Sequence, residues 1–392
     1  MLRLIFALLC LLALPAIAAS PIRIGVSGPF TGGSSPMGIS MRDGIRIAAA
    51  ELNAGGGVLG RPIELVERDD EARNERGAQV VQELVDKERV VAGLGIVNTG
   101  VALASQRFYQ QARVPVITSV ATGSLITKQF LPPLHPDNFV FRVSANDTIQ
   151  AAMIVAEAIQ RRGLTRVAIF HDATNYGQLG REDLERALAD HNVRPVAVER
   201  FNIQQADMSM QLRRARDAGA EAILTYGIGP ELAQIANGMA RINWRAPLIG
   251  SWTLAMSNFI DNAGPNGEGA RMPQTFIPEA TTPRRKAFLD AWRKATGNPR
   301  IPVPPAAAQG YDSLLLLAAA IRQAGSTDGD RIREALENLD EKIDGVVMAY
   351  QRPFTRERHE TITSVHDIFM GEVRNGQVVF AYDEDRRRAS AR

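Results

Sequence analysis

The chain has 392 residues, and its 45 Lys and Arg residues nearly balance 43 Asp and Glu residues, giving a formal net charge of +2. This balance, without a basic helix that carries interleaved aromatic residues, argues against a nucleic-acid-binding protein. The single cysteine, Cys10, excludes a disulfide framework. The length favours two domains rather than one.

The N-terminus has the features of a secretory signal. Arg3 precedes an apolar run, Leu4 to Leu14, which is too short to span a bilayer. Ala16 and Ala18 are the small residues that signal peptidase accepts. We therefore expect residues 1–18 to be cleaved off and the mature chain, which then contains no cysteine, to lie in the periplasm.

The first part of the mature chain alternates strands with helices. Buried β-rich segments predict strands at residues 22–26, 62–67, 90–95 and 114–118. The helix after the first strand is indicated by Met41, Ile45, Ala48 and Leu52, which share one helical face, and by the glycines at 55–57, which end it. Further helices are expected around residues 78–85 and 100–112.

The same alternation starts again after residues 139–143. Expected strands lie at residues 166–171, 193–199, 220–226 and 247–250, with helices at 148–161 and from about 177, 208 and 230. Three expected helices follow, at residues 284–296, 306–324 and 328–339, before strands around the turn at 375–376. These helices have no sheet of their own, so they must pack on the two sheets already formed. The sequence thus predicts an α/β protein of two lobes, each a parallel sheet flanked by helices.

Motifs of common enzymes are missing from this sequence. It contains no Walker phosphate loop, no complete GxGxxG, no GxSxG and no HExxH motif. The five histidines show no metal-ligand spacing, and the acidic run at 69–71 reads as a solvated turn. We therefore expect no catalytic residue, no metal site and no cofactor.

Hydroxyl side chains follow two of the expected strands. Thr99 stands where a helix begins after the strand at 90–95, and Thr122 follows the strand at 114–118. Such positions suit a ligand carboxylate, because backbone N–H groups and a hydroxyl can bind it together. Spacing alone leaves open the alternative that both threonines only cap helices.

Residues 22–380 resemble the leucine/isoleucine/valine-binding family, the type I periplasmic solute receptors of ABC importers. The resemblance rests on motifs in a fixed order: GPFTG at 28–32, LNAGGGVLGRPIEL at 52–65, VPVI at 114–117, FR at 141–142, and FHD followed by YG at 170–177. It implies two lobes joined by three crossings, near 142–144, 271–275 and 356–366. The implied lobes are residues 19–142 with 273–357 and residues 143–272 with 358–385, before a basic tail at 386–392.

The resemblance also implies the ligand site. Thr99 and Thr122 match positions that hold a ligand carboxylate, Tyr176 matches an aromatic that closes over the ligand, and the full set of matching positions is Met37, Asn98, Thr99, Ala121, Thr122, Tyr176, Ile228 and Trp252. Trp252 departs from the pattern, because amino-acid binders have an acidic side chain there for the ligand ammonium. Asp172, Glu231 or Glu279 could substitute for that acid. Otherwise Trp252 favours stacking on a flat or apolar ligand.

These observations lead to one expected function and two alternatives. We expect a monomeric periplasmic receptor that closes on a small molecule and passes it to an ABC permease and ATPase complex in the inner membrane. The ligand is either a branched-chain amino acid or an aromatic or aliphatic carboxylate without the amine. The alternatives are an exported ligand-sensing module, which uses the same closure, and an exported α/β enzyme.

Overall fold

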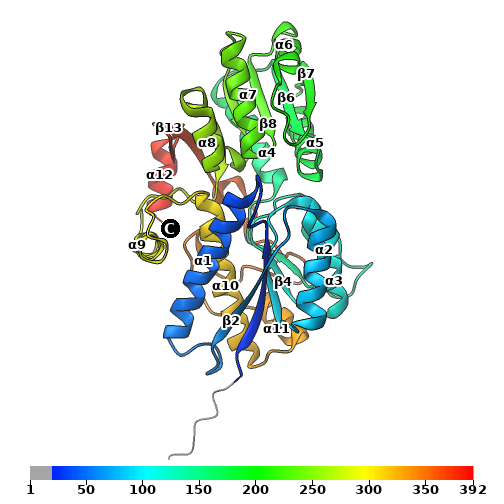
Figure 1. The fold of residues 1–392 in the computed structure, drawn as a ribbon, viewed down its shortest axis with the longest axis vertical. Coiled ribbons are helices and arrows are strands. Elements are labelled where there is room, and N and C mark those ends of the chain that lie inside the picture. The colour runs from blue at the N-terminus through cyan, green and yellow to red at the C-terminus, as the bar shows by residue number, and fades with distance from the viewer. Residues whose placement is uncertain (1–19, 392) are drawn as a thin grey trace, which may run out of the picture.

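A computed structural model describes residues 20–391, so the predicted signal peptide lies outside the described residues. Figure 1 shows two lobes, one above the other, with the chain passing between them. Among the described helices, none is both long and apolar enough to cross a membrane.

The first lobe is built on a five-stranded parallel sheet of order β2-β1-β3-β4-β5. Its strands are β1 (Ile22–Gly28), β2 (Ile63–Asp69), β3 (Ala92–Gly95), β4 (Val116–Thr118) and β5 (Val140–Arg142). In Figure 1, α1 and α10 lie on one side of this sheet and α2 and α3 on the other. The helices of this lobe are α1 (Ser35–Ala54), α2 (Asn74–Gln82), α3 (Thr99–Ala112), α9 (Pro283–Thr296), α10 (Pro304–Ala324) and α11 (Gly329–Glu337).

The second lobe has a seven-stranded sheet of order β14-β13-β10-β9-β8-β6-β7. Its strands are β6 (Val167–Asp172), β7 (Ala197–Phe201), β8 (Ala222–Tyr226), β9 (Leu248–Gly250), β10 (Arg271–Gln274), β13 (Phe369–Arg374) and β14 (Gln377–Phe380). The expected parallel sheet is present from β7 to β10, and β13 and β14 add an antiparallel edge. The helices are α4 (Asp147–Ala156), α5 (Asn175–Ala189), α6 (Ser209–Asp217), α7 (Gly229–Arg241), α8 (Ser257–Ala263) and α12 (Asp383–Ser390).

The crossings between the lobes lie side by side. The first leaves β5 for α4, the second leaves β10 for α9, and the third leads through residues 354–365 to β13. The first and third are joined by backbone hydrogen bonds, from Arg142 N to His359 O at 2.8 Å and from Thr361 N to Arg142 O at 3.1 Å. The small β11 (Ile343–Asp344) and β12 (Ala349–Tyr350) pair precedes the third crossing.

Two of the predicted lobe boundaries fall inside secondary-structure elements. The boundary between residues 272 and 273 lies within β10, which pairs along its length with β13 of the second lobe. The predicted basic tail begins at residue 386, inside α12. Arg388 donates to Ile368 O at 2.6 Å and to the Asp385 carboxylate at 2.8 Å, and these bonds tie α12 to the second lobe. The arginine run is therefore part of a folded helix.

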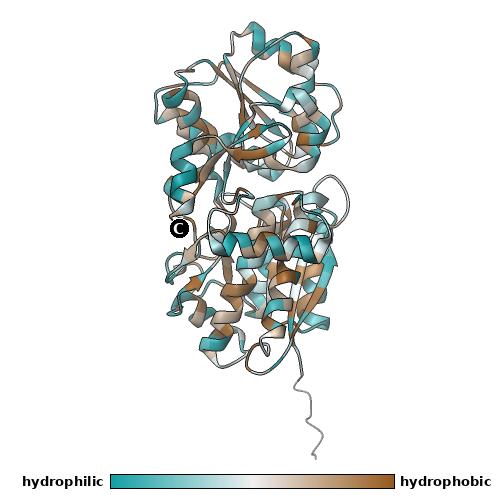
Figure 2. Ribbon diagram, turned by 90° about the vertical axis from the view of Figure 1, so that its left-hand side faces the viewer, coloured by the Kyte–Doolittle hydropathy of each residue, from teal (hydrophilic) through white to brown (hydrophobic). Residues whose placement is uncertain are grey.

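The first lobe depends on close packing of α1 against α10. Figure 2 shows hydrophobic residues gathered on the strands and inner helix faces of both lobes. The two helices approach so closely that a Cβ atom on Gly44 would lie 2.1 Å from Ala307 O, and one on Gly310 would lie 2.3 Å from Met41 O. Both contacts are with backbone, which cannot move aside as a flexible side chain can. The two glycines therefore set the distance between these helices.

We predict that Gly44→Ala lowers the free energy of unfolding by about 1–3 kcal/mol, because it overpacks this contact. Gly55→Ala is the matched control, since Gly55 ends the same helix with φ −82° and its added Cβ would meet nothing closer than 3.4 Å. Urea denaturation followed by circular dichroism measures both changes. Equal stability of the two variants would contradict this role for Gly44.

Candidate functional site

Thr99 and Thr122 lie at the carboxyl ends of neighbouring parallel strands, β3 and β4, where the first lobe faces the second. Their loops are in direct contact, because Gly123 N donates to Thr99 Oγ1 at 3.3 Å. A side chain at Gly123 would come within 2.4 Å of Thr99 Cγ2, so only glycine permits this approach. The sheet thus brings the two predicted carboxylate positions together.

The alternative that these threonines only cap helices is wrong. Asn98, not Thr99, is the N-cap residue of α3, and its side chain makes no capping hydrogen bond. Its Nδ2 donates instead to Ser34 Oγ at 3.1 Å. Thr122 lies in an irregular segment between a bend at 119–120 and a turn that leads to the 3₁₀ turn at Ile126–Lys128, so it begins no helix.

The second lobe presents hydroxyl and aromatic groups to the same place. Tyr176 lies in the first turn of α5, and its hydroxyl donates to Ser251 Oγ at 2.6 Å, next to Trp252. The Tyr176 ring packs edge-on against Tyr226 at a centroid distance of 5.4 Å. Burial raises the pKa of Tyr176 well above its usual value, so the phenol stays protonated and remains a hydrogen-bond donor.

Four of the predicted positions form part of one buried apolar cluster that spans both lobes. Met37 comes from α1 of the first lobe, and Tyr176, Ile228 and Trp252 come from the second. All four are at most 8% exposed. Ala121 lies apart from them, in the cluster between α3 and β4, and its carbonyl accepts from Ser144 Oγ at 2.8 Å.

The two lobes touch around this cluster. Asn258 Nδ2, on α8, donates to Gly33 O of the first lobe at 2.9 Å, and Ser257 N donates to Pro302 O at 2.9 Å. On the other side, a Cβ atom on Gly100 would lie 2.9 Å from Asn175 Oδ1 of α5. The site is therefore enclosed by contacts that exist only when the lobes are together.

Asp147 is a member of this site that the sequence analysis did not identify. It lies at the start of α4, is fully buried, and its carboxyl accepts a hydrogen bond from the Thr122 hydroxyl. Its Oδ1 also accepts from Gln150 Nε2 at 3.3 Å, whereas Oδ2 is buried without a partner among residues 20–391. Burial raises the pKa of Asp147 to about 8, and the nearby Asp183 carboxylate adds to the rise. The sequence signal was its place directly after the first crossing.

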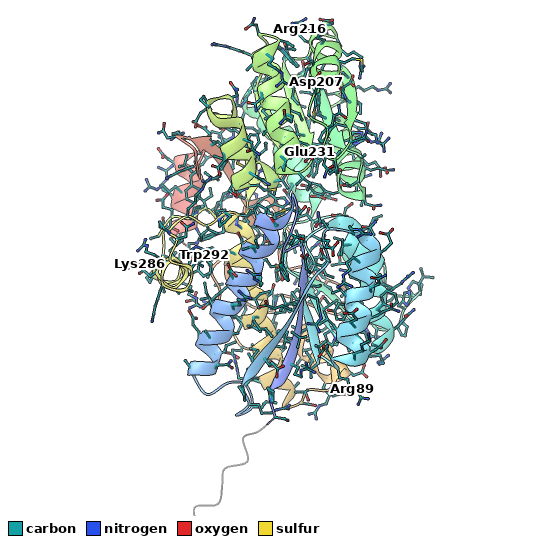
Figure 3. The ribbon with its side chains drawn as sticks, viewed as in Figure 1. Arg89, Asp207, Arg216, Glu231, Lys286 and Trp292 are labelled. Atoms are coloured by element: carbon teal, nitrogen blue, oxygen red, sulfur yellow. The ribbon has the colours of Figure 1, made fainter. Side chains whose placement is uncertain are left out.

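The acids considered earlier as partners for a ligand ammonium are engaged elsewhere. Asp172 Oδ1 accepts from Thr174 N at 2.9 Å and from Gly177 N at 3.2 Å, which fixes the start of α5. Glu231, labelled on α7 of the upper lobe in Figure 3, accepts from Gln204 N at 2.7 Å. Glu279 pairs with Arg386 at 2.5 Å. Asp147 is therefore the carboxyl group that bonds directly to a predicted ligand residue.

Arg142 connects the site to the crossings. This arginine is fully buried, and its Nη1 donates to Thr122 O at 3.1 Å and Gly123 O at 2.7 Å. Its Nη2 forms an ion pair with Glu360 of the third crossing. Glu360 accepts in turn from Thr127 and Asn146, and these bonds lower its pKa together with the charge of Arg142, against the opposing effect of burial. The loop that carries Thr122 is thus held by the segments that must bend when the lobes move.

The arrangement can bind and enclose a small molecule. Across residues 20–391, no group of three or more His, Asp or Glu side chains is placed to hold a metal ion. The polar groups that converge are hydroxyls, backbone amides and one protonated carboxyl, which suit recognition of a polar head group beside an aromatic wall.

Comparison with known proteins agrees with this geometry. The profile of the family described as "Periplasmic binding protein" matches residues 21–377. A leucine-, isoleucine-, valine-, threonine- and alanine-binding protein of Pseudomonas aeruginosa is 25% identical over 82% of this chain and 83% of its own length. A Leu/Ile/Val-binding protein homolog of Brucella abortus is 28% identical, over 85% and 87% of the two chains. The crystal structure of a leucine-binding protein from Thermotoga maritima has a TM-score of 0.79 and 26% identity, covering 92% of this chain and 98% of the other.

We predict that Asp147 makes the folded protein less stable as the pH rises. The folded state holds its proton up to a pKa of about 8, whereas the unfolded chain loses it near 3.8, so the folded state binds more protons between these values. The free energy of unfolding therefore falls over this range, for this group by up to roughly 4 kcal/mol over three pH units. Asp147→Asn should lose less stability than the wild type between about pH 5 and pH 8.

Urea denaturation across this pH range measures the difference. Other buried acids with raised pKa values titrate equally in both proteins, namely Asp70, Asp172 and Asp312. Asp290→Asn serves as the control, because Asp290 is exposed and its pKa is lowered by a hydrogen bond from Lys286. Parallel curves for wild type and Asp147→Asn would show that Asp147 does not hold a proton in the folded state.

Proposed function

Because the chain belongs to the periplasmic binding protein family, we propose that it is the solute receptor of an ABC importer and captures a small carboxylate between its lobes. The observation that carries this proposal is the convergence of Thr99, Thr122, Tyr176 and Trp252 from both lobes. Contacts between the lobes, such as the hydrogen bond from Asn258 to Gly33 O, form only in the closed state. A ligand that binds both lobes therefore shifts the equilibrium from the open to the closed state.

The carboxylate is proposed to bind where α3 begins. The first N–H groups of a helix have no acceptor inside the helix, and the positive end of its dipole favours an anion. Thr99 occupies the first position of α3, and the Thr122 loop lies against it through Gly123. A carboxylate at this junction can accept bonds from backbone amides and from the Thr99 hydroxyl, and from the Thr122 hydroxyl once its proton turns from Asp147 to the ligand.

The rest of the site favours a ligand without an ammonium group. Trp252 takes the place of the acid that amino-acid binders use, and its buried ring supports an aromatic or aliphatic body. Asp147 is the carboxyl bonded to Thr122, but with a pKa of about 8 it is mainly neutral at pH 7. A buried ammonium without a charged partner costs several kcal/mol in effective terms. We therefore propose an aromatic or aliphatic carboxylate as the ligand class.

A branched-chain amino acid is the second candidate, and one observation favours it. Asp147 Oδ2 is buried with no partner in the described part of the chain, so an arriving ammonium could ionise this carboxyl and pair with it. The relatives named for binding leucine, isoleucine and valine point the same way. Calorimetry with leucine, isoleucine and valine against benzoate and branched aliphatic acids distinguishes the two classes.

The proposal places the protein in the periplasm as a monomer that delivers ligand to a permease and ATPase complex in the inner membrane. A sensory module would use the same closure and the same site. Adjacent permease and ATPase genes would favour import, and release by osmotic shock tests the compartment. Chemical conversion of a bound ligand would support the alternative that the protein is an exported α/β enzyme.

We predict that Thr122→Ala weakens binding of the best carboxylate in this panel at least about tenfold, because a hydrogen bond to a charged group is lost. Thr122→Ser is the matched control, since it keeps the hydroxyl that also bonds Asp147. Isothermal titration calorimetry measures both affinities. If Thr122→Ala binds as tightly as Thr122→Ser, the carboxylate lies elsewhere.

We predict that Asn258→Ala weakens the same affinity by about two- to tenfold and speeds dissociation, because the interlobe bond to Gly33 O exists only in the closed state. Asn266→Ala is the control, since Asn266 bonds Asn237 within the second lobe at 2.8 Å. Stopped-flow fluorescence of the ligand-induced change gives the rates. An unchanged dissociation rate for Asn258→Ala would exclude this contact from the closed complex.

A further inference from the structure

A small cavity extends from the ligand site toward the crossings. It begins at Thr122 and Trp252, and its walls come from both lobes and from the crossings. The remaining lining residues are Ala145, Gln150, Pro273, Gln274, Thr275, Pro305, Gln309 and Ile368. It has room for about one water-sized group, so it can accept a substituent of a ligand but not a second ligand.

Two polar atoms of the lining residues are buried without a partner. Trp252 Nε1 is a donor and Gln274 Oε1 is an acceptor, and neither finds a hydrogen-bond partner within residues 20–391. Their residues are only 7% and 1% exposed. Buried polar groups are nearly always paired in native proteins, because an unpaired one loses its hydrogen bonds to water without replacement. This pair of atoms therefore requires an external partner.

The orientation of both groups is set by their neighbours. Gln274 Nε2 donates to Pro273 O at 2.7 Å and to Trp252 O at 3.3 Å, which identifies the amide nitrogen and leaves Oε1 as the free acceptor. A Cβ atom on Gly371 would lie 2.9 Å from Gln274 Cγ, so glycine there leaves room for the glutamine stem. The Trp252 backbone is held from the other side, because Trp252 N donates to Gln150 Oε1 at 3.2 Å.

We propose that this cavity is a hydroxyl subsite of the ligand site, which selects small carboxylates that carry a hydroxyl group. A hydroxyl oxygen accepts from Trp252 Nε1 while its proton is donated to Gln274 Oε1. An ammonium can only donate, a carboxylate can only accept, and a methyl group can do neither. Of these groups, only the hydroxyl can both accept and donate, as the two unpartnered atoms require. The proposal rests on the proposed function, which supplies the carboxylate at Thr122.

The test compares matched ligand pairs in four proteins. The pairs are benzoate with each of its three monohydroxy derivatives, and valine with threonine, in which a hydroxyl replaces a methyl group. In the wild type, at least one hydroxylated ligand should bind about tenfold more tightly than its parent, because the parent leaves both atoms unpaired. Trp252→Phe removes the donor and Gln274→Met removes the acceptor, and either change should reduce that preference to less than about threefold.

Trp292→Phe is the matched control. Trp292, labelled on α9 in Figure 3, is also buried, and its Nε1 has no partner among the residues that the structure describes, but it does not line the cavity. This variant removes the same indole N–H group from a site outside the cavity. It should therefore keep the wild-type preference for the hydroxylated ligand, even if the substitution changes the stability of the protein. Thermal denaturation of all four proteins identifies any variant that fails to fold.

The outcomes separate the two proposals. If carboxylates bind but no hydroxylated ligand is preferred, the cavity holds only a structural water and the subsite is excluded while the receptor function stands. A preference that persists in both Trp252→Phe and Gln274→Met excludes it as well. If no carboxylate of any pair binds, the proposed ligand class fails and the hydroxyl subsite fails with it.

Discussion

The ion pair between the buried Arg142 and the partly buried Glu360 is the interaction on which the rest of the architecture depends. It joins the first and third crossings, and the same guanidinium holds the carbonyls of Thr122 and Gly123. Removing one partner of a buried pair leaves an uncompensated charge and typically costs 3–5 kcal/mol. The first and third crossings and the Thr122 loop are therefore one hydrogen-bonded unit.

The chemistry of the site follows from what each lobe can bring to this loop. Parallel strands place Thr99 and Thr122 at one edge, where backbone amides and hydroxyls favour an anion. The second lobe contributes Tyr176 and Trp252, a wall of aromatic surface with few charges. Asp147 adds a carboxyl whose burial keeps it protonated, so the enclosed site offers hydrogen bonds rather than a full negative charge. The ratio of hydrogen-bonding groups to charged groups therefore determines which small molecules the site can enclose.

Much of the fold was predictable because its elements carry strong local patterns. Most of the expected strands and helices are present in the expected order, but α8, β10, the β11–β12 pair and α12 were not predicted. Other deviations occur where tertiary pairing decides the ends of an element. The strand expected at 193–199 is observed at Ala197–Phe201, because it pairs with β6 from Ala168 to Asp172. The strands around the turn at 375–376 were expected, but their addition to the second sheet was not, since pairing of β10 with β13 joins segments about a hundred residues apart. Arg386, expected in a solvated tail, is folded into α12 by similar long-range contacts.

The sequence by itself determined the two-lobed α/β class and the family, because periodicity and ordered motifs are local properties of the chain. Through the resemblance to that family it also predicted Thr99, Thr122, Tyr176 and Trp252 as ligand positions. Only the tertiary structure decided how these side chains are used. Whether a hydroxyl caps a helix, or a carboxyl such as Asp147 is charged, depends on burial and on partners from distant segments. The tertiary structure also showed that Trp252 Nε1 has no partner within the described part of the chain, since a sequence does not show which polar atoms remain unpaired after packing.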